Sequence, residues 1–264
     1  MSTDSGSKIN KLMSAYPHGV VLLSAWLGKE GYSLDLLKRY KDSKWLESIG
    51  SGALKRHGDR IGYEGGLFAL QKQSGLNIHA GGKTALSILG KSHYLELSAK
   101  KVVLFGAENE KLPAWFKNYD WGISVEYHAL KFLPTEVGLV DFELNSFSIK
   151  VSGAARALME CLYLAPKKQN LLECYELMEG LNNLRPDHVQ SLLEKCGSVK
   201  VKRLFLYLAE KADHSWLEYV DLGKVNLGSG KRSIVDNGVY DNKYRITIPK
   251  ELGKHGRKKL YKTS

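Results

Sequence analysis

The sequence predicts an α+β fold, and three features of its 264 residues predict it. Residues 1–60 contain short capped helical segments followed by a hairpin pattern with a glycine turn, which is typical of a winged helix-turn-helix. Residues 61–151 mix helical segments with strand-like segments at 76–79, 102–105, 124–128, 139–144 and 147–151, which indicates a mixed α/β middle region. Residues 152–264 are mainly helical, with helix stops at glycine or proline. We therefore expect three regions with these boundaries.

The first helix of the helix-turn-helix is expected to follow Ser24, whose side-chain oxygen can accept hydrogen bonds from the free N–H groups of a helix start. Gly31 is expected to end this helix, because glycine readily adopts the left-handed conformation found after a helix. An earlier helix around residues 9–13 ends before Pro17 and completes a three-helix core.

The second helix is expected to begin after Ser33, a second N-cap, and to run to about Lys44. Plotted at about 100° per residue, its apolar residues cluster on one side, namely Leu36, Leu37 and Tyr40. The opposite side carries the charged residues Asp35, Lys38, Arg39 and Asp42. A helix that packs by one face and offers cations on the other is typical of a recognition helix in a DNA major groove.

Residues 45–56 are expected to form the wing, a two-stranded hairpin with a glycine turn at residues 50–52. In this interpretation Lys38 and Arg39 read bases or phosphates, and the wing grips the DNA backbone through Lys55 and Arg56. The full set of residues expected to contact DNA is Ser33, Lys38, Arg39, Lys41, Lys44, Lys55 and Arg56.

Positive charge is concentrated at the two ends of the chain. Residues 1–100 carry 14 lysines and arginines against 8 acids, a net charge of +6, and residues 243–264 carry 8 against 1, a net charge of +7. Residues 101–242 carry 17 against 19, a net charge of −2. A basic N-terminal region favours a polyanion partner, because neutralised phosphates release counterions. The basic run at 254–259 could add to DNA binding, although such a run is more commonly a solvated chain end.

Several motifs are spread over nearly the whole chain. They are Pro17, Gly19-Val20-Val21-Leu22, Ser24-Ala25-Trp26-Leu27, Trp45-Leu46-x-x-Ile49-Gly50-x-Gly52, Gly66-Leu67-x-Ala69-Leu70-Gln71, His79-x-Gly81-Gly82-Lys83-Thr84-Ala85-Leu86 and, more loosely, Tyr244-Arg245-Ile246-Thr247-Ile248-Pro249. Together these motifs resemble the AbiEi antitoxins of type IV toxin–antitoxin systems. The chain departs from the family at 154–157, where Ala-Ala-Arg-Ala replaces the frequent Pro-Glu-Arg-Ala.

The resemblance implies a regulator of an abortive-infection system used in phage defence. Its first region would repress transcription of its own operon by binding operator DNA at its own promoter. Its region 152–264 would act as the antitoxin against a nucleotidyltransferase-like toxin encoded next to it. In this family, antitoxin and toxin need not form a stable complex.

An enzymatic function is not expected. The run Gly81-Gly82-Lys83-Thr84 lies between a strand and a helix as a phosphate loop would, but the glycine required at position 77 is asparagine, so we expect a tight turn into a helix. Asp141 and Glu143 could project from one strand face as in a metal-dependent nuclease, but a lysine is missing at position 145. Two alternatives remain: a winged helix fused to a nuclease-like domain, and a ligand-responsive transcription factor with a pocket in its middle region.

Neither a metal nor a cofactor is expected. Cys161, Cys174 and Cys196 are odd in number and far apart, which favours buried thiols in a reducing compartment over disulfides or zinc. The eight histidines show no paired metal-ligand spacing. The chain has no apolar run of signal-peptide length and none near the ~20 residues of a membrane helix, so we expect a cytoplasmic protein.

Two further expectations concern the C-terminal half. Residues 225–227, a turn at 236–238 and residues 244–248 indicate a closing hairpin. Because residues 152–264 have their own helical pattern, a truncation beginning near Ser98 is expected to lose repression and to keep most of its action against the toxin.

Overall fold

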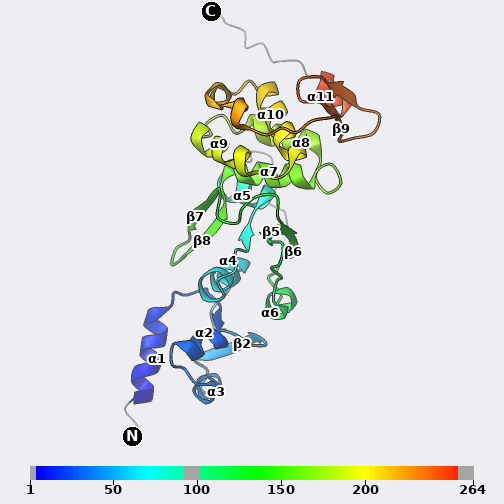
Figure 1. The fold of residues 1–264 in the computed structure, drawn as a ribbon. Helices are drawn as coiled ribbons and strands as arrows, with labels where there is room; N and C mark the ends of the chain where they lie inside the picture. The colour runs from blue at the N-terminus through cyan, green and yellow to red at the C-terminus, as the bar shows by residue number, and fades with distance from the viewer. Residues whose placement is uncertain (1–3, 92–100, 255–264) are drawn as a thin grey trace, which may run out of the picture. The chain divides into compact units, whose positions relative to one another are not determined.

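The computed structural model describes residues 4–91 and 101–254, and the chain divides into two compact units (Figure 1). Unit 1 combines residues 1–79, 100–129 and 141–151, and unit 2 combines residues 80–99, 130–140 and 152–264. The chain therefore passes from one unit to the other five times. The expected middle region, residues 61–151, contributes to both units.

The N-terminal part of unit 1 is a winged helix-turn-helix, as predicted (Figure 1, blue). Its helices are α1 (Asp4–Ala15), α2 (Ser24–Lys29) and α3 (Leu34–Asp42), and its sheet contains β1 (Leu22–Leu23), β3 (Ala53–Arg56) and β2 (Leu46–Gly50) in that order. β2 and β3 pair antiparallel and form the wing. A buried cluster joins the three helices to the sheet and includes Leu12, Leu27, Leu37, Tyr40, Leu46 and Leu54. The apolar face predicted for α3 therefore lies in this core.

The ends of α2 and α3 show which of the predicted caps the chain uses. Ser33 caps α3, since its Oγ accepts a hydrogen bond at 3.3 Å from the backbone N–H three residues on. Gly31 follows α2 with a φ of +88°, the left-handed conformation predicted for it. The prediction that Ser24 caps α2 is wrong. The extended residue before the helix is Leu23, and Ser24 is already helical, with its N–H bonded to the carbonyl of Gly52 at 2.8 Å.

The remainder of unit 1 contains a helix and most of a five-stranded sheet. The helix is α4 (Tyr63–Phe68), which continues as a π-helical turn, η1 (Ala69–Gln73). The strands lie in the order β6 (Ser124–Leu130), β5 (Lys101–Ala107), β4 (His79–Ala80), β8 (Ser148–Ser152) and β7 (Leu139–Glu143), and the short α6 (Ala114–Asn118) connects β5 to β6 along the chain. The four strands predicted between residues 102 and 151 are all present. β4 covers only His79 and Ala80, so it shares a single residue with the strand expected over residues 76–79.

Two close contacts attach α4 and η1 to the winged helix. The buried side chain of Gln73 accepts a hydrogen bond from the Leu23 N–H at 2.7 Å and donates one to the Val21 carbonyl at 2.8 Å. Gly65 approaches the backbone before β1, because a Cβ placed on it would lie 1.9 Å from the carbonyl oxygen of Gly19. Only glycine allows this approach of two backbones.

Unit 2 is mainly helical, as predicted. Its longer helices are α5 (Gly82–Ile88), α7 (Ala154–Leu164), α8 (Leu171–Glu179), α9 (Pro186–Lys195) and α10 (Val199–Lys211), followed by the 3₁₀ turns η2 (Ser215–Tyr219) and η3 (Leu222–Lys224). α5 contributes Ala85 and Leu86 to the buried core of this unit. A protein beginning near Ser98 would lack α5, so a folded unit 2 is not expected from that truncation.

The last sheet differs from the predicted hairpin. β10 (Val239–Asp241) pairs antiparallel with β11 (Ile246–Ile248), β9 (Arg232–Ser233) pairs parallel with β11, and α11 (Lys250–Lys254) follows. The strand predicted within 244–248 is present as β11, and it belongs to an antiparallel pair. Residues 225–227 form no strand and the turn at 236–238 only leads into β10, so these two parts of the prediction are wrong.

Buried Arg203 on α10 gives the physical reason for this difference. Its guanidinium donates hydrogen bonds of 2.8 to 3.2 Å to four backbone carbonyls, those of Leu227, Gly228, Gly230 and Arg245. These contacts hold residues 227–230 against α10, so the segment cannot pair as a strand.

Candidate functional site

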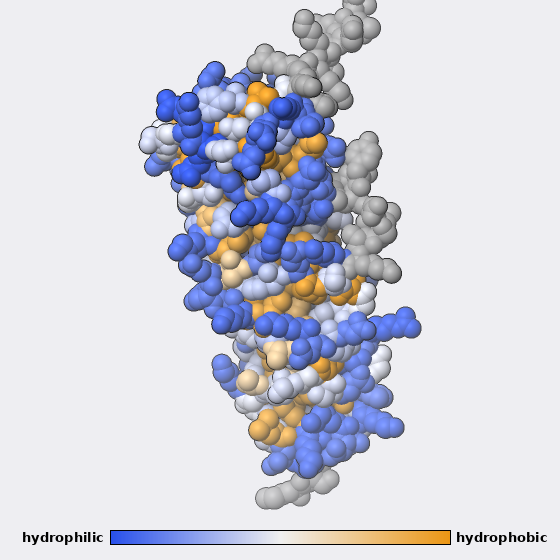
Figure 2. Space-filling model, turned by 90° about the vertical axis from the view of Figure 1, so that its right-hand side faces the viewer, coloured by the Kyte–Doolittle hydropathy of each residue, from blue (hydrophilic) through white to orange (hydrophobic). Residues whose placement is uncertain are grey.

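The exposed face of α3 carries unpaired positive charge. Lys38, Arg39 and Lys41 on the helix and Lys44 just after it are all exposed. Among the residues that the structure describes, none of these four side chains has an ion-pair or hydrogen-bond partner. Figure 2 shows hydrophilic residues gathered over the end of unit 1 that carries α3. This face therefore offers four cations to a polyanion.

Polar residues at the start and end of α3 complete this face. Ser33 is exposed, and because its Oγ acts as acceptor in the helix cap, its hydroxyl proton is left for a second partner. Asp35 lies in the first turn, where the helix dipole favours negative charge, and Asp42 is exposed at the last turn.

Lys55 is held in the wing by contacts within the protein. Its Nζ lies 2.5 Å from Glu47 Oε1 across the hairpin and donates to the carbonyl of Asp59 at 2.6 Å, and its side chain is only 12% exposed. The hydrogen bond from Lys55 outweighs the burial of Glu47 and lowers the pKa of that carboxyl group. Contact of Lys55 with a DNA backbone, as expected from the sequence, would require it to leave these partners.

Arg56 is buried and joins the wing to the end of α1. Its Nη2 donates to the carbonyls of Met13 and Tyr16, and its Nη1 lies 2.9 Å from Nε2 of His18. The residue is only 8% exposed, so the expected grip of Arg56 on the DNA backbone conflicts with its position in the protein interior. The sequence gives no sign of this role, because its partners lie about 40 residues earlier.

Asp59 continues the network of Arg56. Its Oδ1 lies 3.0 Å from Nδ1 of His18, and its Oδ2 accepts a hydrogen bond from the Gly19 N–H at 3.0 Å. Burial alone would raise the pKa of Asp59, but the hydrogen bonds from Gly19 and His18 outweigh it and the pKa is lowered overall. The ionised carboxylate thus fixes residues 18–19 to the end of the wing.

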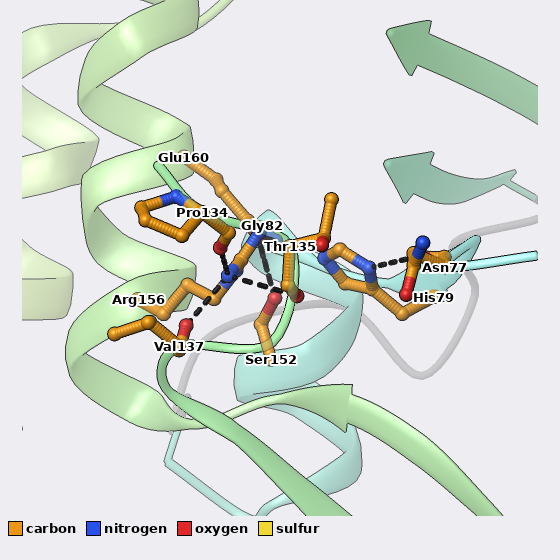
Figure 3. A network of polar contacts seen from close by, with 9 residues as sticks. All are labelled: Asn77, His79, Gly82, Pro134, Thr135, Val137, Ser152, Arg156 and Glu160. Carbon is orange, nitrogen blue, oxygen red and sulfur yellow. Dashed lines mark hydrogen bonds and ion pairs between the residues drawn. The ribbon is translucent and has the colours of Figure 1, made fainter. Parts of the chain in front are cut away.

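A buried ion pair that the sequence did not predict lies in unit 2 (Figure 3). Glu160 on α7 is fully buried and accepts hydrogen bonds from Arg156 Nε at 2.9 Å and from Ser152 Oγ at 2.8 and 2.9 Å. Arg156 Nη1 donates to the carbonyls of Pro134 and Val137 at 2.8 and 2.5 Å. These hydrogen bonds supply the partners that a buried ion pair requires.

The start of α5 provides another partner for Glu160. The Gly82 N–H donates to Glu160 Oε2 at 2.9 Å, so a carboxylate of the protein occupies the place at a helix N-terminus where a phosphate would bind. Lys83, which a phosphate loop would direct at its ligand, pairs with Glu173 at 2.8 Å. The glycine motif therefore joins α5 to α7, and α5 begins at Gly82 as a tight turn into a helix.

The two acids on β7 are exposed, and one of them has a basic partner. Asp141 Oδ1 lies 3.0 Å from Lys150 Nζ on β8, and Glu143 lies two residues further along the strand. Within residues 4–91 and 101–254, no group of three His, Cys, Asp or Glu side chains is arranged to hold a metal ion.

A cavity of about 450 Å³ lies in unit 2 beside the starts of α7 and α9. Gly138, Gly153 and Leu192 line it, and Arg185 at its edge is paired with Asp187 at 2.9 Å. A ligand-responsive factor was expected to have its pocket within residues 61–151. This cavity is lined mostly by residues after 151, whereas a second cavity of about 470 Å³ in unit 1 is lined mostly by residues of the middle region, at 62–65 and 142–147.

The three cysteines are free and buried. Burial raises the pKa of Cys174 to about 12 and also raises the pKa values of Cys161 and Cys196, so all three are protonated thiols near neutral pH. The basic run at 254–259 lies outside the described residues apart from the backbone of Lys254. No helix among the described residues is long and apolar enough to cross a membrane.

Comparisons with known proteins identify the family of this chain. Residues 5–97 match a family model described as the N-terminal domain of the AbiEi antitoxin transcriptional regulator, and residues 99–249 match one described as "Transcriptional regulator, AbiEi antitoxin, Type IV TA system". The crystal structure of the RV2827C protein from Mycobacterium tuberculosis is similar in fold, with a TM-score of 0.56 at 12% identity over 93% of this chain and 91% of that one. No curated protein matches the chain.

Proposed function

The chain belongs to the AbiEi antitoxins, a family of transcriptional regulators of type IV toxin–antitoxin systems rather than enzymes, and on this premise we propose that it represses its own operon by placing α3 in the major groove of its operator. The proposal is carried by the unpaired cations of α3. Leu37 and Tyr40 fix the opposite face of the helix in the winged-helix core. A helix held in this way brings its cations to phosphates and base edges.

Within this proposal the predicted DNA-binding residues have two roles. The direct contacts come from Ser33, Lys38, Arg39, Lys41 and Lys44. Lys55 and Arg56 act indirectly, because their contacts within the protein keep the wing and the end of α1 in place.

Operator binding by a triple variant tests this proposal. Lys38, Arg39 and Lys41 are replaced together by alanine, and the slope of log K against log salt concentration is measured on DNA from the chain's own promoter. We expect weaker binding and a slope smaller by about 3, since each lost phosphate contact removes about 0.9 from it. A matched control replaces three other exposed lysines, Lys72, Lys111 and Lys195, and should bind as the wild type does. Wild-type affinity in the α3 variant would overturn the proposal.

We further propose that unit 2 counteracts a nucleotidyltransferase-like toxin encoded beside this chain. Family membership supports an antitoxin role for the chain. The test is growth of cells that express the adjacent reading frame with or without the full chain. Restored growth is expected. A toxic adjacent frame that the full chain fails to counteract would overturn this assignment.

A further inference from the structure

Leu34 is an exposed leucine at the first position of α3. It is 74% exposed, whereas Leu36 and Leu37 on the same helix are 7% and 3% exposed. The next most exposed large aliphatic side chain within the described residues, that of Val239, is 45% exposed. Leu34 therefore adds little to the winged-helix core, and an apolar side chain lies at the surface beside the cations of α3.

Leu34 lies at the N-terminal end of α3, where its side chain would face the bases if α3 lay in a major groove. In helix-turn-helix proteins the N-terminal residues of the recognition helix contact base edges. At about 100° per residue, Leu34 lies about 40° from Lys38 and about 20° from Lys41 around the helix axis. The three side chains therefore share one side of α3, with the leucine nearest the helix start and the lysines one and two turns further on.

The chemistry of the base edges determines which base this leucine can contact. A leucine side chain cannot donate or accept a hydrogen bond, so it cannot read the donor and acceptor groups that identify guanine, cytosine or adenine. The C5-methyl of thymine is the apolar group that base pairs present in the major groove. We propose that Leu34 contacts a thymine methyl group and thereby sets a base preference at one position of each bound site. This inference rests on the proposed insertion of α3 into the major groove.

Replacement of thymine by deoxyuridine isolates this contact. The change removes one methyl group and leaves the sugar, the phosphate and the base-pairing edge unaltered. A leucine that packs on the sugar or against a second copy of the protein would therefore be insensitive to it. The operator is first footprinted, and each thymine within the protected site is then replaced singly while the affinity of the full-length protein is measured.

We expect the affinity of the wild-type protein to fall about fourfold when one particular thymine of a bound site is replaced by deoxyuridine. This factor corresponds to the free energy of burying one methyl group. Leu34→Ala should bind the thymine and the deoxyuridine operators equally, and its salt slope should equal that of the wild type, because no charge is lost. A matched control, Leu222→Ala, removes an exposed leucine from η3 in unit 2 and should keep the wild-type sensitivity to deoxyuridine.

The outcomes separate this inference from the proposed function. If the wild type binds its operator and no single deoxyuridine weakens binding, the role of Leu34 is wrong and DNA binding through α3 stands. The same holds if Leu34→Ala keeps the fourfold difference. If the wild type does not bind its operator at all, the proposed function is wrong and this inference with it.

Discussion

The carboxylate of Glu160 lies 2.9 Å from the backbone nitrogen of Gly82, 78 residues earlier in the sequence. Arg156, one helical turn before Glu160, supplies the opposite charge and also binds the carbonyls of Pro134 and Val137. Two side chains of α7 thus connect three separate segments of unit 2. Both are buried, so each depends on the other for its counter-charge.

Removing one member of this pair should destabilise the protein strongly. Glu160→Gln is expected to lower the free energy of unfolding by about 3–5 kcal/mol, because it leaves the Arg156 guanidinium buried without a counter-charge. Urea denaturation measures the change. The double variant with Arg156→Met should lose less than the sum of the two single variants, since it also removes the orphaned charge. Strictly additive losses would contradict the coupling of the two residues.

Arg56 and Lys38 should affect different properties. Arg56→Met is expected to lower the free energy of unfolding by about 3 kcal/mol, because buried hydrogen bonds to backbone carbonyls are lost. Lys38→Ala should change stability by less than about 0.5 kcal/mol and reduce the salt slope of operator binding by about 1. Denaturant melts and salt titrations on both variants check this. If folded Arg56→Met instead shows a reduced salt slope, Arg56 contacts DNA directly, as expected from the sequence.

Two glycines in different helices of unit 1 should respond oppositely to alanine. Gly65→Ala is expected to destabilise unit 1 by about 3 kcal/mol, since the new Cβ would meet the carbonyl oxygen of Gly19 and both backbones would have to separate. Gly28 in α2 has open space around it, so Gly28→Ala should stabilise the helix by about 0.5–1 kcal/mol. Denaturation midpoints measured side by side decide this, and equal effects would refute the close approach.

The stability of unit 1 should depend on pH through Asp59. Its pKa is lower in the folded protein than the ordinary value of 3.8, so its ionised form stabilises the fold above that value. The contribution is lost as the pH falls from about 4 through the folded pKa. Asp59→Asn should therefore be less stable than the wild type at pH 6, and the gap should narrow toward pH 3. A gap that stays constant over this range would show that ionisation of Asp59 does not matter.

Repression and toxin neutralisation should be separable by substitution in the full chain. The variant in which Lys38, Arg39 and Lys41 are alanine is expected to lose repression of its promoter and to restore growth against the toxin as the wild type does, because α3 lies in unit 1. A promoter–reporter assay and a growth assay in the same cells measure both. Loss of growth rescue in a variant that accumulates normally would show that DNA binding is needed for neutralisation.

Local features of the sequence predicted the fold well where short-range chemistry decides the structure. Ser33 caps α3 and Gly31 is left-handed, because both effects involve only neighbouring residues. The roles of Arg56 and Glu160 could not be predicted in this way. Arg56 binds residues about 40 positions away, and Glu160 binds the Gly82 N–H 78 positions away. Arg156 lies only four residues from Glu160, but a charged pair in a sequence carries no mark of being buried.

The alternation of the chain between its two units also has a consequence for synthesis. β4 pairs with β5 on one side and with β8 on the other, and β8 ends at Ser152. At about 5–20 residues per second, a ribosome that has completed β4 at residue 80 needs roughly 4 to 14 s more to complete β8 at residue 152. During that time β4 has an open edge on the nascent chain, where unpaired strands favour aggregation. β4 is only two residues long, which keeps this temporary edge short.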